Sequence, residues 1–533
     1  MIKKLPEMEN KKSLMELPEK EEVIFRIEPN IDIPVFPDVA KEQINFRYPL
    51  MAPYAFAHIY WDPKIKEVVY YVEEPILTPK EKKVLILLEE GIKELINISF
   101  INIQKREKTI SYLEKNVKVF LNELQIALSR DSYLKVMYFI YRDFVGLGTV
   151  EPFMNDYFIE DVECNGINFP IYVVHRKFRN LRTSIMFYSN KETAAFVEKL
   201  AQRCGQYISY ATPLLDGALP DGSRVNATFT EDISSRGPTF TIRKFTKNPW
   251  SPIQLINFGT INADILAYLW LLIEYERNVM IIGGTASGKT TFLNALTFFI
   301  PPQARIVSIE DTRELNLEHD NWLPSVARAG VGLANLVGQK YGEITLFNLL
   351  KESFRQHPNY VIVGEIRGEE AYVLFQGMAS GHPSFGTMHA NSVDTMIKRL
   401  ETPPINLSSS LVETMDAVVS MASTRVKGKE VRRMMELMEI ISINDEKGNV
   451  LNRPFYWDPV EDKYIYAAES YVFKKLMTQQ GISQEVLLNE WKRRTLLLNS
   501  MNDHKIFDFH TVQQIINEYY KDPNAVLKKF GII

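Results

Sequence analysis

Residues 283–290 read Gly-Gly-Thr-Ala-Ser-Gly-Lys-Thr and match the pattern G-x-x-x-x-G-K-[ST] in full. Glycines at both ends let the backbone bend around phosphates where a Cβ would collide. The exposed N–H groups and the start of a following helix would then face the negative charge. These residue types predict a triphosphate cradle in which Lys289 reaches the β- and γ-phosphates and Thr290 ligates Mg²⁺. The predicted nucleotide-binding residues are Gly283, Gly284, Thr285, Ala286, Ser287, Gly288, Lys289, Thr290 and Thr291.

A cradle alone hydrolyses nothing, because a carboxylate must also orient or deprotonate the attacking water. The segment 309–314, Ile-Glu-Asp-Thr-Arg-Glu, places Glu310, Asp311 and Glu314 at the end of an apolar run. Three acids this close are costly unless a cation lies nearby, and Mg²⁺ or Arg313 could supply it. The alternative is a solvated acidic turn.

Two further groups follow apolar runs in the same part of the chain. The segment 361–365, Val-Ile-Val-Gly-Glu, ends in Glu365, where many P-loop enzymes have an aspartate that holds Mg²⁺. Glutamate is one methylene longer, which predicts contact with the metal through water. His389 follows the small-residue run 384–388 and could sense the γ-phosphate, although a lone histidine is more often a core or surface residue.

The elements that must position these groups form a strand–helix alternation. Apolar runs of this kind are typical of parallel strands covered on both faces, so we expect an α/β fold with its site at the strand ends. A helix is expected from Thr290 to Phe299. The predicted strands are Val279–Ile282, Ile306–Ile309, Tyr360–Val363, Ser384–Met388, Ala417–Met421 and Met434–Ile441.

The remainder of the chain divides into segments that differ in their predicted secondary structure. Helical spacing predicts helices over 79–98 and 108–146, and turn-rich sequence with short strands follows from about 147. The two prolines within 247–252 indicate a linker. The tail beyond 470 is helical, with Val512, Ile515, Ile516 and Tyr519 on one side.

Composition excludes several classes of protein. The 533 residues carry a net charge of −4, which argues against a general nucleic-acid coat. Two cysteines, Cys164 and Cys204, cannot form a four-thiolate zinc site and are expected to be reduced thiols. The apolar stretch Ile265–Ile273 is far shorter than a membrane span, and no signal peptide is expected. We expect a soluble, cytoplasmic protein that reaches the membrane only through partners.

The four motifs, in this order, resemble the secretion ATPases of type II and type IV systems. That superfamily has a Walker A motif, an aspartate box, a Walker B strand ending in Gly-Glu and a histidine box. The matching segments here are 283–290, 309–314, 361–365 and 381–391, and the resemblance spans about 140–445. The bacterial type II members usually carry a tetracysteine zinc module that is absent here, as in the archaeal branch. Residues 308–322 and 48–62 are similar to archaeal members, and most similar to the archaellum ATPases.

The resemblance implies a role for each matching residue. Glu314 would prepare the attacking water, Glu310 and Asp311 would support Mg²⁺ and water, and Glu365 would bind Mg²⁺ indirectly. His389 would sense the γ-phosphate. Asp-Gly-Ser-Arg at 221–224 and Ile-Arg-Lys at 242–244 match the segments that carry arginine fingers in the family, which implies Arg224 and Arg243.

The resemblance also implies an architecture and partners. We expect a RecA-like P-loop core over 253–533 with a helical tail, preceded by an α+β domain over 101–246 that covers the nucleotide. Residues 1–100 would be a helical, partner-docking region. The expected assembly is a hexamer that uses ATP and Mg²⁺, acts on a polytopic membrane platform protein and meets accessory cytoplasmic motor proteins. Lysines among residues 3–12 could also contact anionic lipid.

Three functions are compatible with these features. The first is a motor that assembles, and rotates, an archaeal pilin-like filament, either the archaellum or an adhesive pilus. The second is a nucleic-acid-driven ATPase of the same core fold, against which the acidic balance argues, so no nucleic acid is expected. The third is a nucleotide-gated scaffold in which hydrolysis is incidental.

Overall fold

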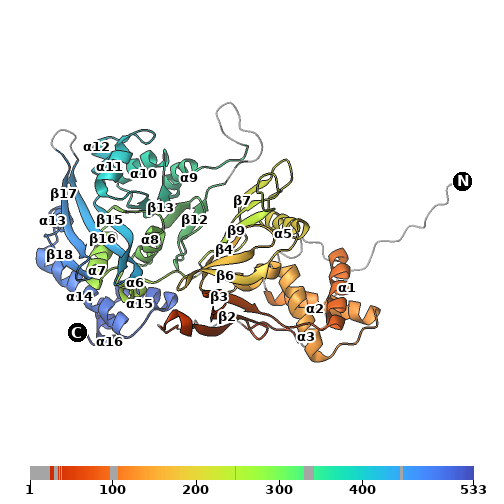
Figure 1. Ribbon diagram of the computed structural model, residues 1–533. Coiled ribbons are helices and arrows are strands. Elements are labelled where there is room, and N and C mark those ends of the chain that lie inside the picture. The colour runs from red at the N-terminus through yellow and green to blue at the C-terminus, as the bar shows by residue number, and fades with distance from the viewer. Residues whose placement is uncertain are drawn as a thin grey trace, which may run out of the picture. The chain divides into compact units, whose positions relative to one another are not determined.

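The computed structural model describes residues 24–28, 34, 36, 37, 39–95, 106–246, 248–328, 330, 341–443 and 448–533. The chain forms two compact units, Met1–Lys244 (unit 1) and Phe245–Ile533 (unit 2). Each unit has its own sheet, and both are drawn in Figure 1. The N-terminal lysines considered for lipid contact, and Lys247 at the start of the expected linker, lie outside the described residues.

The sheet of unit 1 is mostly antiparallel. Its strand order is β1-β2-β3-β6-β5-β4-β9-β8-β7, and β3 pairs with β6 in parallel. The short strands expected after about 147 are confirmed as β4 to β9. The bounds are β1 Asn45–Met51, β2 Ala55–Asp62, β3 Glu67–Glu73, β4 Ile159–Cys164, β5 Pro170–His175, β6 Arg179–Met186, β7 Leu214–Ala218, β8 Arg224–Thr228 and β9 Thr239–Arg243.

The segments expected as separate regions, 1–100 and 101–246, share this sheet. The pairing of β3 with β6 extends it across both segments, and buried Asp156 accepts hydrogen bonds from the hydroxyls of Tyr48 (2.7 Å) and Tyr70 (2.6 Å). The described part of 1–100 is therefore a strand meander followed by a helix, and it belongs to one unit with the segment after it.

The helices of unit 1 correct one prediction. The single long helix expected over 108–146 is two helices, separated where Gln125 takes a φ of +51° and Ser129 caps the second helix. A left-handed residue interrupts helical hydrogen bonding, and serine is a preferred N-cap. The bounds are α1 Pro79–Leu95, α2 Arg106–Glu123, α3 Arg130–Ile140, α4 Glu151–Met154 and α5 Asn190–Arg203.

The sheet of unit 2 has the order β12-β11-β13-β14-β10-β15-β16-β17-β18. All six predicted strands are present, and the pairs from β12 to β15 are parallel. The prediction of a parallel strand at Met434–Ile441 is wrong, because this strand, β16, returns antiparallel to β15 through a tight hairpin. The bounds are β10 Val279–Gly283, β11 Ile306–Glu310, β12 Trp322–Val326, β13 Tyr360–Ile366, β14 Ser384–Met388, β15 Ala417–Val426, β16 Lys429–Ser442, β17 Val450–Asp458 and β18 Lys463–Tyr466.

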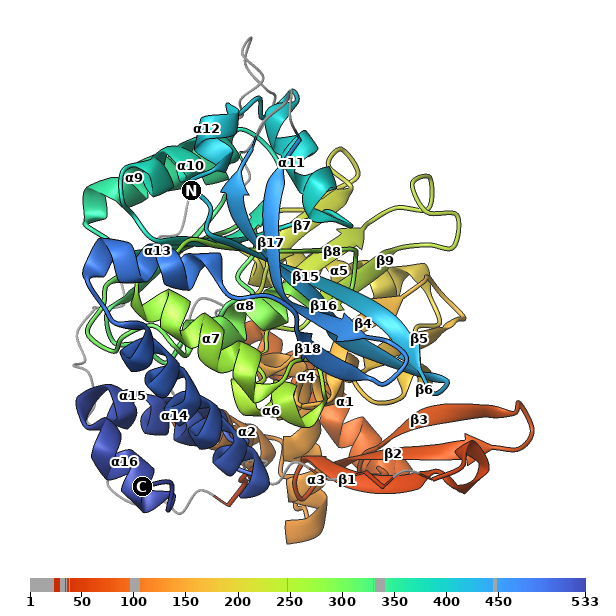
Figure 2. The same ribbon diagram turned by 90° about the vertical axis from the view of Figure 1, so that its left-hand side faces the viewer.

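Helices cover both faces of the parallel strands (Figures 1 and 2). Successive side chains of β10 alternate between two cores: Val279 and Ile281 pack with α7, α8 and the tail, whereas Met280 and Ile282 pack with α9–α12. This two-sided burial explains why the strands are apolar without alternation. The bounds are α6 Pro252–Asn257, α7 Ala263–Glu274, α8 Lys289–Thr297, α9 Leu346–Ser353, α10 Glu370–Ala379, α11 Val393–Glu401, α12 Ser409–Val412, α13 Tyr471–Gln480, α14 Gln484–Asp503, α15 Phe509–Lys521 and α16 Pro523–Lys529.

The tail packs on the core of unit 2. The predicted apolar side of α15 is confirmed, since its four residues are buried in the core that also holds α7 and α8. Two side chains of α15 also bind the carboxyl end of α8: Gln513 donates to the Phe298 carbonyl (3.1 Å) and Tyr520 to that of Phe299 (2.6 Å). Unpaired helix carbonyls need such partners. The tail therefore braces the helix that begins at Lys289.

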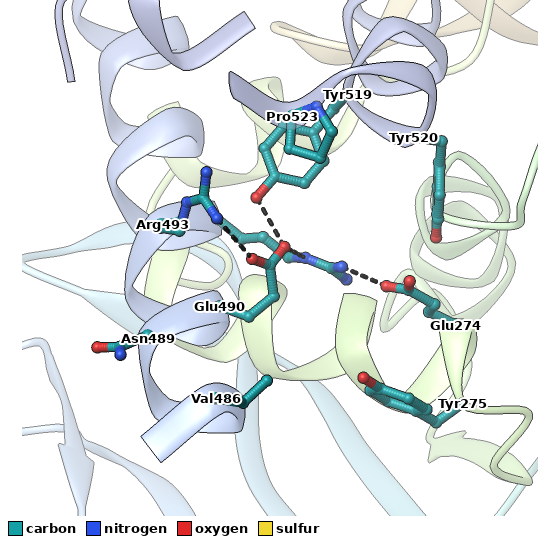
Figure 3. Close-up of a pocket in the computed structure, with 10 residues that line it drawn as sticks. Glu274, Tyr275, Val486, Asn489, Glu490, Arg493, Tyr519, Tyr520 and Pro523 are labelled. Carbon is teal, nitrogen blue, oxygen red and sulfur yellow. Dashed lines mark hydrogen bonds and ion pairs between the residues drawn. The ribbon is translucent and has the colours of Figure 1, made fainter. Parts of the chain in front are cut away.

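Figure 3 shows a pocket of about 430 Å³ lined by α14, α15, Pro523 and the end of α7. Its wall includes Arg494, which is 3% exposed, forms ion pairs with Glu274 and Glu490, and lies 4.7 Å above the ring of Trp270. None of the predicted nucleotide-site residues lines this pocket.

Replacing Arg494 with alanine should destabilise unit 2 by about 3 kcal/mol, because two partly buried carboxylates lose their common partner. The matched change Arg493→Ala should cost less than about 1 kcal/mol, since that side chain is one-third exposed and its ion pair is long at 3.6 Å. Urea unfolding followed by tryptophan fluorescence measures both. Equal midpoints for the two variants would contradict the expected role of Arg494.

Within the part of the chain that the structure describes, no helix has both the length and the apolar character needed to cross a bilayer.

Candidate nucleotide-binding site

The loop 283–290 joins the end of β10 to the start of α8, as the motif predicts. Strand β10 is fully buried between β14 and β15. A Cβ on Gly283 would lie 2.3 Å from the carbonyl oxygen of Met421, and Gly288 has a φ of +91°. Both positions therefore require glycine, for close approach in one case and for backbone conformation in the other.

Lys289 lies against the loop that it follows in sequence. Its side chain is largely buried, and its ammonium donates to the carbonyls of Gly283 (3.1 Å) and Gly284 (2.9 Å). Burial holds the pKa of Lys289 below its ordinary value, against the charges of Glu365 and Glu314. The cradle thus carries a cation directed at its own backbone.

Two predicted residues from neighbouring strands join this cation. His389, just beyond β14, has Nδ1 3.2 Å from Lys289 Nζ, and its Nε2 lies 3.2 Å from Glu365 Oε1 on β13. Burial raises the pKa of Glu365, but the hydrogen bond and charge of Arg367 outweigh it and hold the pKa below its ordinary value. Lys289, His389 and Glu365 therefore form one connected chain at the ends of three adjacent strands.

Arg367 is a site residue that the sequence analysis missed. Its guanidinium lies 2.5 Å from Glu365 and 3.5 Å from Asp311, and so it connects two acids that are 54 positions apart in sequence. The cation expected there was Mg²⁺ or Arg313. Arg313 lies over the rings of Phe245 (5.3 Å) and Trp322 (5.2 Å), and its charge acts to lower the pKa of Glu310. The only available signal was a basic residue two positions after the Walker B glutamate.

Glu310 shapes the turn that carries Glu314. It is 2% exposed, and its Oε1 accepts hydrogen bonds from the backbone N–H groups of Glu314 and Leu315, both at 2.9 Å. A Cβ on Gly364 would lie 3.0 Å from Glu310 Cγ, which explains glycine before Glu365. Glu314 itself is exposed. The alternative of a solvated acidic turn therefore holds for Asp311 and Glu314, which are exposed, and not for Glu310, which is buried.

The donor set fits Mg²⁺ bound with a nucleotide. Across the described ranges no group of three histidine, cysteine or acidic side chains could hold a metal by itself. Magnesium in nucleotide sites needs only one or two carboxylates beside phosphate oxygens and water. Thr290 is the second residue of α8, directly after Lys289. Thr290, Glu365 and Asp311 thus supply the hard oxygen ligands that this metal prefers.

Arg224 and Arg243 lie side by side in unit 1. They are directly opposed on β8 and β9, which places their side chains on one face of the sheet. Each exposed guanidinium has its own acid: Arg224 binds Asp216 (3.0 Å) and Arg243 binds Asp161 (3.1 Å). The neighbouring Lys244 is partly buried and donates to the carbonyls of Phe153 and Asp156, a structural contact. The role of the two arginines as fingers stays a prediction.

Burial raises the pKa of Glu310 from 4.5 to about 7, although the two backbone N–H groups oppose the rise. A folded-state pKa above the unfolded value means that stability falls as pH rises from about 4.5 to about 7. Glu310→Gln keeps the accepting oxygen and removes the titration. Without nucleotide or Mg²⁺, the variant should gain up to about 3 kcal/mol on the wild type between pH 5 and pH 8.

Thermal unfolding at the two pH values measures this gain, and Glu276→Gln, at an exposed position, is the control. A pH-independent difference between Glu310→Gln and wild type would contradict the shifted pKa.

Comparison with known proteins gives three findings. Residues 167–457 match the family model described as "Type II/IV secretion system protein". An uncharacterized protein of Methanocaldococcus jannaschii is 35% identical over 499 residues, which cover 90% of this chain and 89% of that protein. The type IV secretion system protein PtlH of Bordetella pertussis is 27% identical over 46% of this chain and 79% of its own length.

Solved structures resemble the chain more distantly. The VirB11 ATPase from the Brucella suis type IV secretion system has 23% identity and a TM-score of 0.28, over 54% of this chain and 91% of its own. The Legionella pneumophila ATPase DotB has 17% identity and a TM-score of 0.40, over 68% and 92%. The assignment therefore rests on the sequence matches. The family model spans more than half of the chain and includes all four motifs, so the chain belongs to the type II/IV secretion system protein family.

Proposed function

We propose that this chain binds ATP with Mg²⁺ and hydrolyses it as a motor subunit. The observation that carries the proposal is the connected chain Lys289–His389–Glu365 beside the loop 283–290. It brings a phosphate-binding cation, a histidine and a metal-binding acid to the edge where parallel sheets place their active sites.

Each residue has a defined part in this function. The loop and Lys289 hold the phosphates, and Glu314, exposed on its braced turn, orients the attacking water. Mg²⁺ would be held by Thr290, Glu365 and Asp311 and would neutralise charge on the phosphates. His389 touches both Lys289 and Glu365, so it is placed to respond to the γ-phosphate. Arg224 and Arg243 would compensate phosphate charge once released from their acids.

The wider role follows from the family and from the resemblance to archaellum ATPases. We infer a homo-hexamer at the cytoplasmic face of the membrane, in which hydrolysis moves unit 1 against unit 2. That motion would act on a polytopic membrane platform protein, with accessory motor proteins and anionic lipid nearby. The product is assembly, and rotation, of an archaeal pilin-like filament.

Two measurements test the proposal. The purified protein with Mg²⁺ and ATP should release phosphate, and more so when assembled or bound to anionic vesicles. Strong stimulation by single-stranded DNA would favour the nucleic-acid-driven ATPase instead. Cells lacking the chain should lose swimming; loss of surface adhesion with normal swimming would assign the adhesive pilus.

A further inference from the structure

Arg432 touches the nucleotide-binding loop from a distant part of the chain. It lies on β16, and its Nε donates to the carbonyl of Ala286 at 3.1 Å. A Cβ on Gly288 would lie 3.2 Å from Arg432 Cδ. The side chain therefore lies across Ala286 and Gly288 of the loop.

The contacted residue has an unusual backbone. Ala286 takes a φ of +57°, which is uncommon for a residue other than glycine. Such conformations persist where surrounding contacts hold them, and they concentrate at functional sites. A hydrogen bond from a charged guanidinium is stronger than one from a neutral donor. Arg432 thus supplies a strong external contact to the strained position of the loop.

The strand that carries Arg432 is itself held in place. Neighbouring residues of a strand point to opposite faces, and Arg433, next to Arg432, is buried. Its guanidinium binds both carboxylate oxygens of Asp462, at 2.9 and 3.1 Å, and donates to the Phe258 carbonyl. One arginine therefore fastens β16 to the β17–β18 turn and to α6, while the other reaches the loop.

The pairing of β15 with β10 ends beside the loop, at Met421. The register between β15 and β16 shifts at Ser420/Met421, where Met435 is the extra residue of a bulge. Met421 pairs with Gly283, and its carbonyl is the atom that leaves no room for a Cβ there. A bulge bends the strand and increases its twist. The bend and the Arg432 contact thus act on the same loop.

We propose that Arg432 is a positioning residue that holds the loop 283–290 in its nucleotide-accepting shape and couples it to the β15–β16 hairpin. The link to nucleotide affinity rests on the proposed function, whereas the effect on the loop does not. A movement of β16 would then change the conformation of the loop backbone that holds the phosphates.

The test compares Arg432→Met, Arg432→Lys and Arg425→Ala in the full chain. Methionine keeps the apolar stem and loses the donor, lysine keeps a charged donor, and Arg425 is an exposed residue of the same hairpin. Hydrogen exchange of a peptide covering 283–290 is measured without nucleotide, and the Kd for ATP with Mg²⁺ is measured by calorimetry.

Arg432→Met should speed exchange of the loop about tenfold and weaken ATP binding about tenfold, as expected for one charge-assisted hydrogen bond. The melting temperature should stay close to that of the wild type. Arg432→Lys should recover part of both losses, and Arg425→Ala should match the wild type. Loop exchange in Arg432→Met equal to that in Arg425→Ala would overturn the inference. Failure of the wild type to bind ATP would overturn the proposed function, while the exchange comparison would still decide the role of Arg432.

Discussion

Replacing Lys289 with alanine should remove nucleotide binding almost completely. The ammonium is the cation nearest the loop backbone, at 2.9 and 3.1 Å from two of its carbonyls, and the loop holds no second lysine or arginine. Loss of a charge-assisted contact to phosphate in this largely buried setting should weaken ATP binding at least about 100-fold, or about 2.8 kcal/mol. Calorimetric titration with ATP and Mg²⁺ measures the change.

The control is Lys398→Ala, which removes an exposed lysine of α11 in the same unit. The Lys289 variant should remain folded, because its ammonium contributes only contacts to the loop and to His389. ATP affinity within threefold of the wild type in Lys289→Ala would reject this loop as the phosphate site. Weak binding together with a lowered melting temperature would instead indicate a folding defect, which the control helps to recognise.

The nucleotide loop could be predicted from sequence because its chemistry is local. Eight consecutive residues carry the bend, the N–H groups and the cation, so no tertiary information is needed. The strands could be predicted for a similar reason, since each is a short apolar run. Their direction could not: Met434–Ile441 is a largely apolar run interrupted by Glu436 and Glu439, and the tight hairpin at Lys427–Gly428 makes it antiparallel to β15.

Contacts set by strand order escaped prediction. Arg367 joins Asp311 to Glu365 because β11 and β13 are neighbours, and Arg432 meets Ala286 because β15 follows β10 in the sheet. Sequence distance carries no information about either pair. The extension of the unit 1 sheet by β1–β3 escaped for the same reason, since its parallel pairing to β6 joins residues more than 100 positions apart.

The acidic segment shows how similar residues separate into different tasks. Glu310 lies inward on β11 and uses its carboxylate to hold the backbone of the turn, while Asp311 faces Arg367 and Glu314 faces solvent. Glu310 is the last residue of β11, in which every residue is buried, whereas Asp311 lies beyond the end of the strand and is exposed. Glu314 is therefore the carboxylate of this segment with neither a backbone-bracing role nor the arginine contact of Asp311.

Replacing Glu314 with glutamine should stop hydrolysis while leaving nucleotide binding intact. Glutamine preserves the size of the side chain and the turn, because Glu310 contacts the backbone of residue 314 and not its side chain. It cannot accept a proton, and general-base catalysis is worth about 10²–10⁴ in rate. We therefore expect turnover to fall about 1,000-fold with an ATP affinity within about threefold of the wild type.

Phosphate release and calorimetric ATP binding, measured on the same assembled preparation, separate the two effects. Glu318→Gln is the matched control, because it neutralises another exposed acid, which lies four residues beyond Glu314 and pairs with His510 at 2.8 Å. Its turnover should equal that of the wild type. Wild-type turnover in Glu314→Gln would remove this residue from the chemistry and shift the role of base to Glu365, whose carboxylate already contacts His389 and Arg367. A loss of binding in step with turnover would show instead that Glu314 holds the nucleotide.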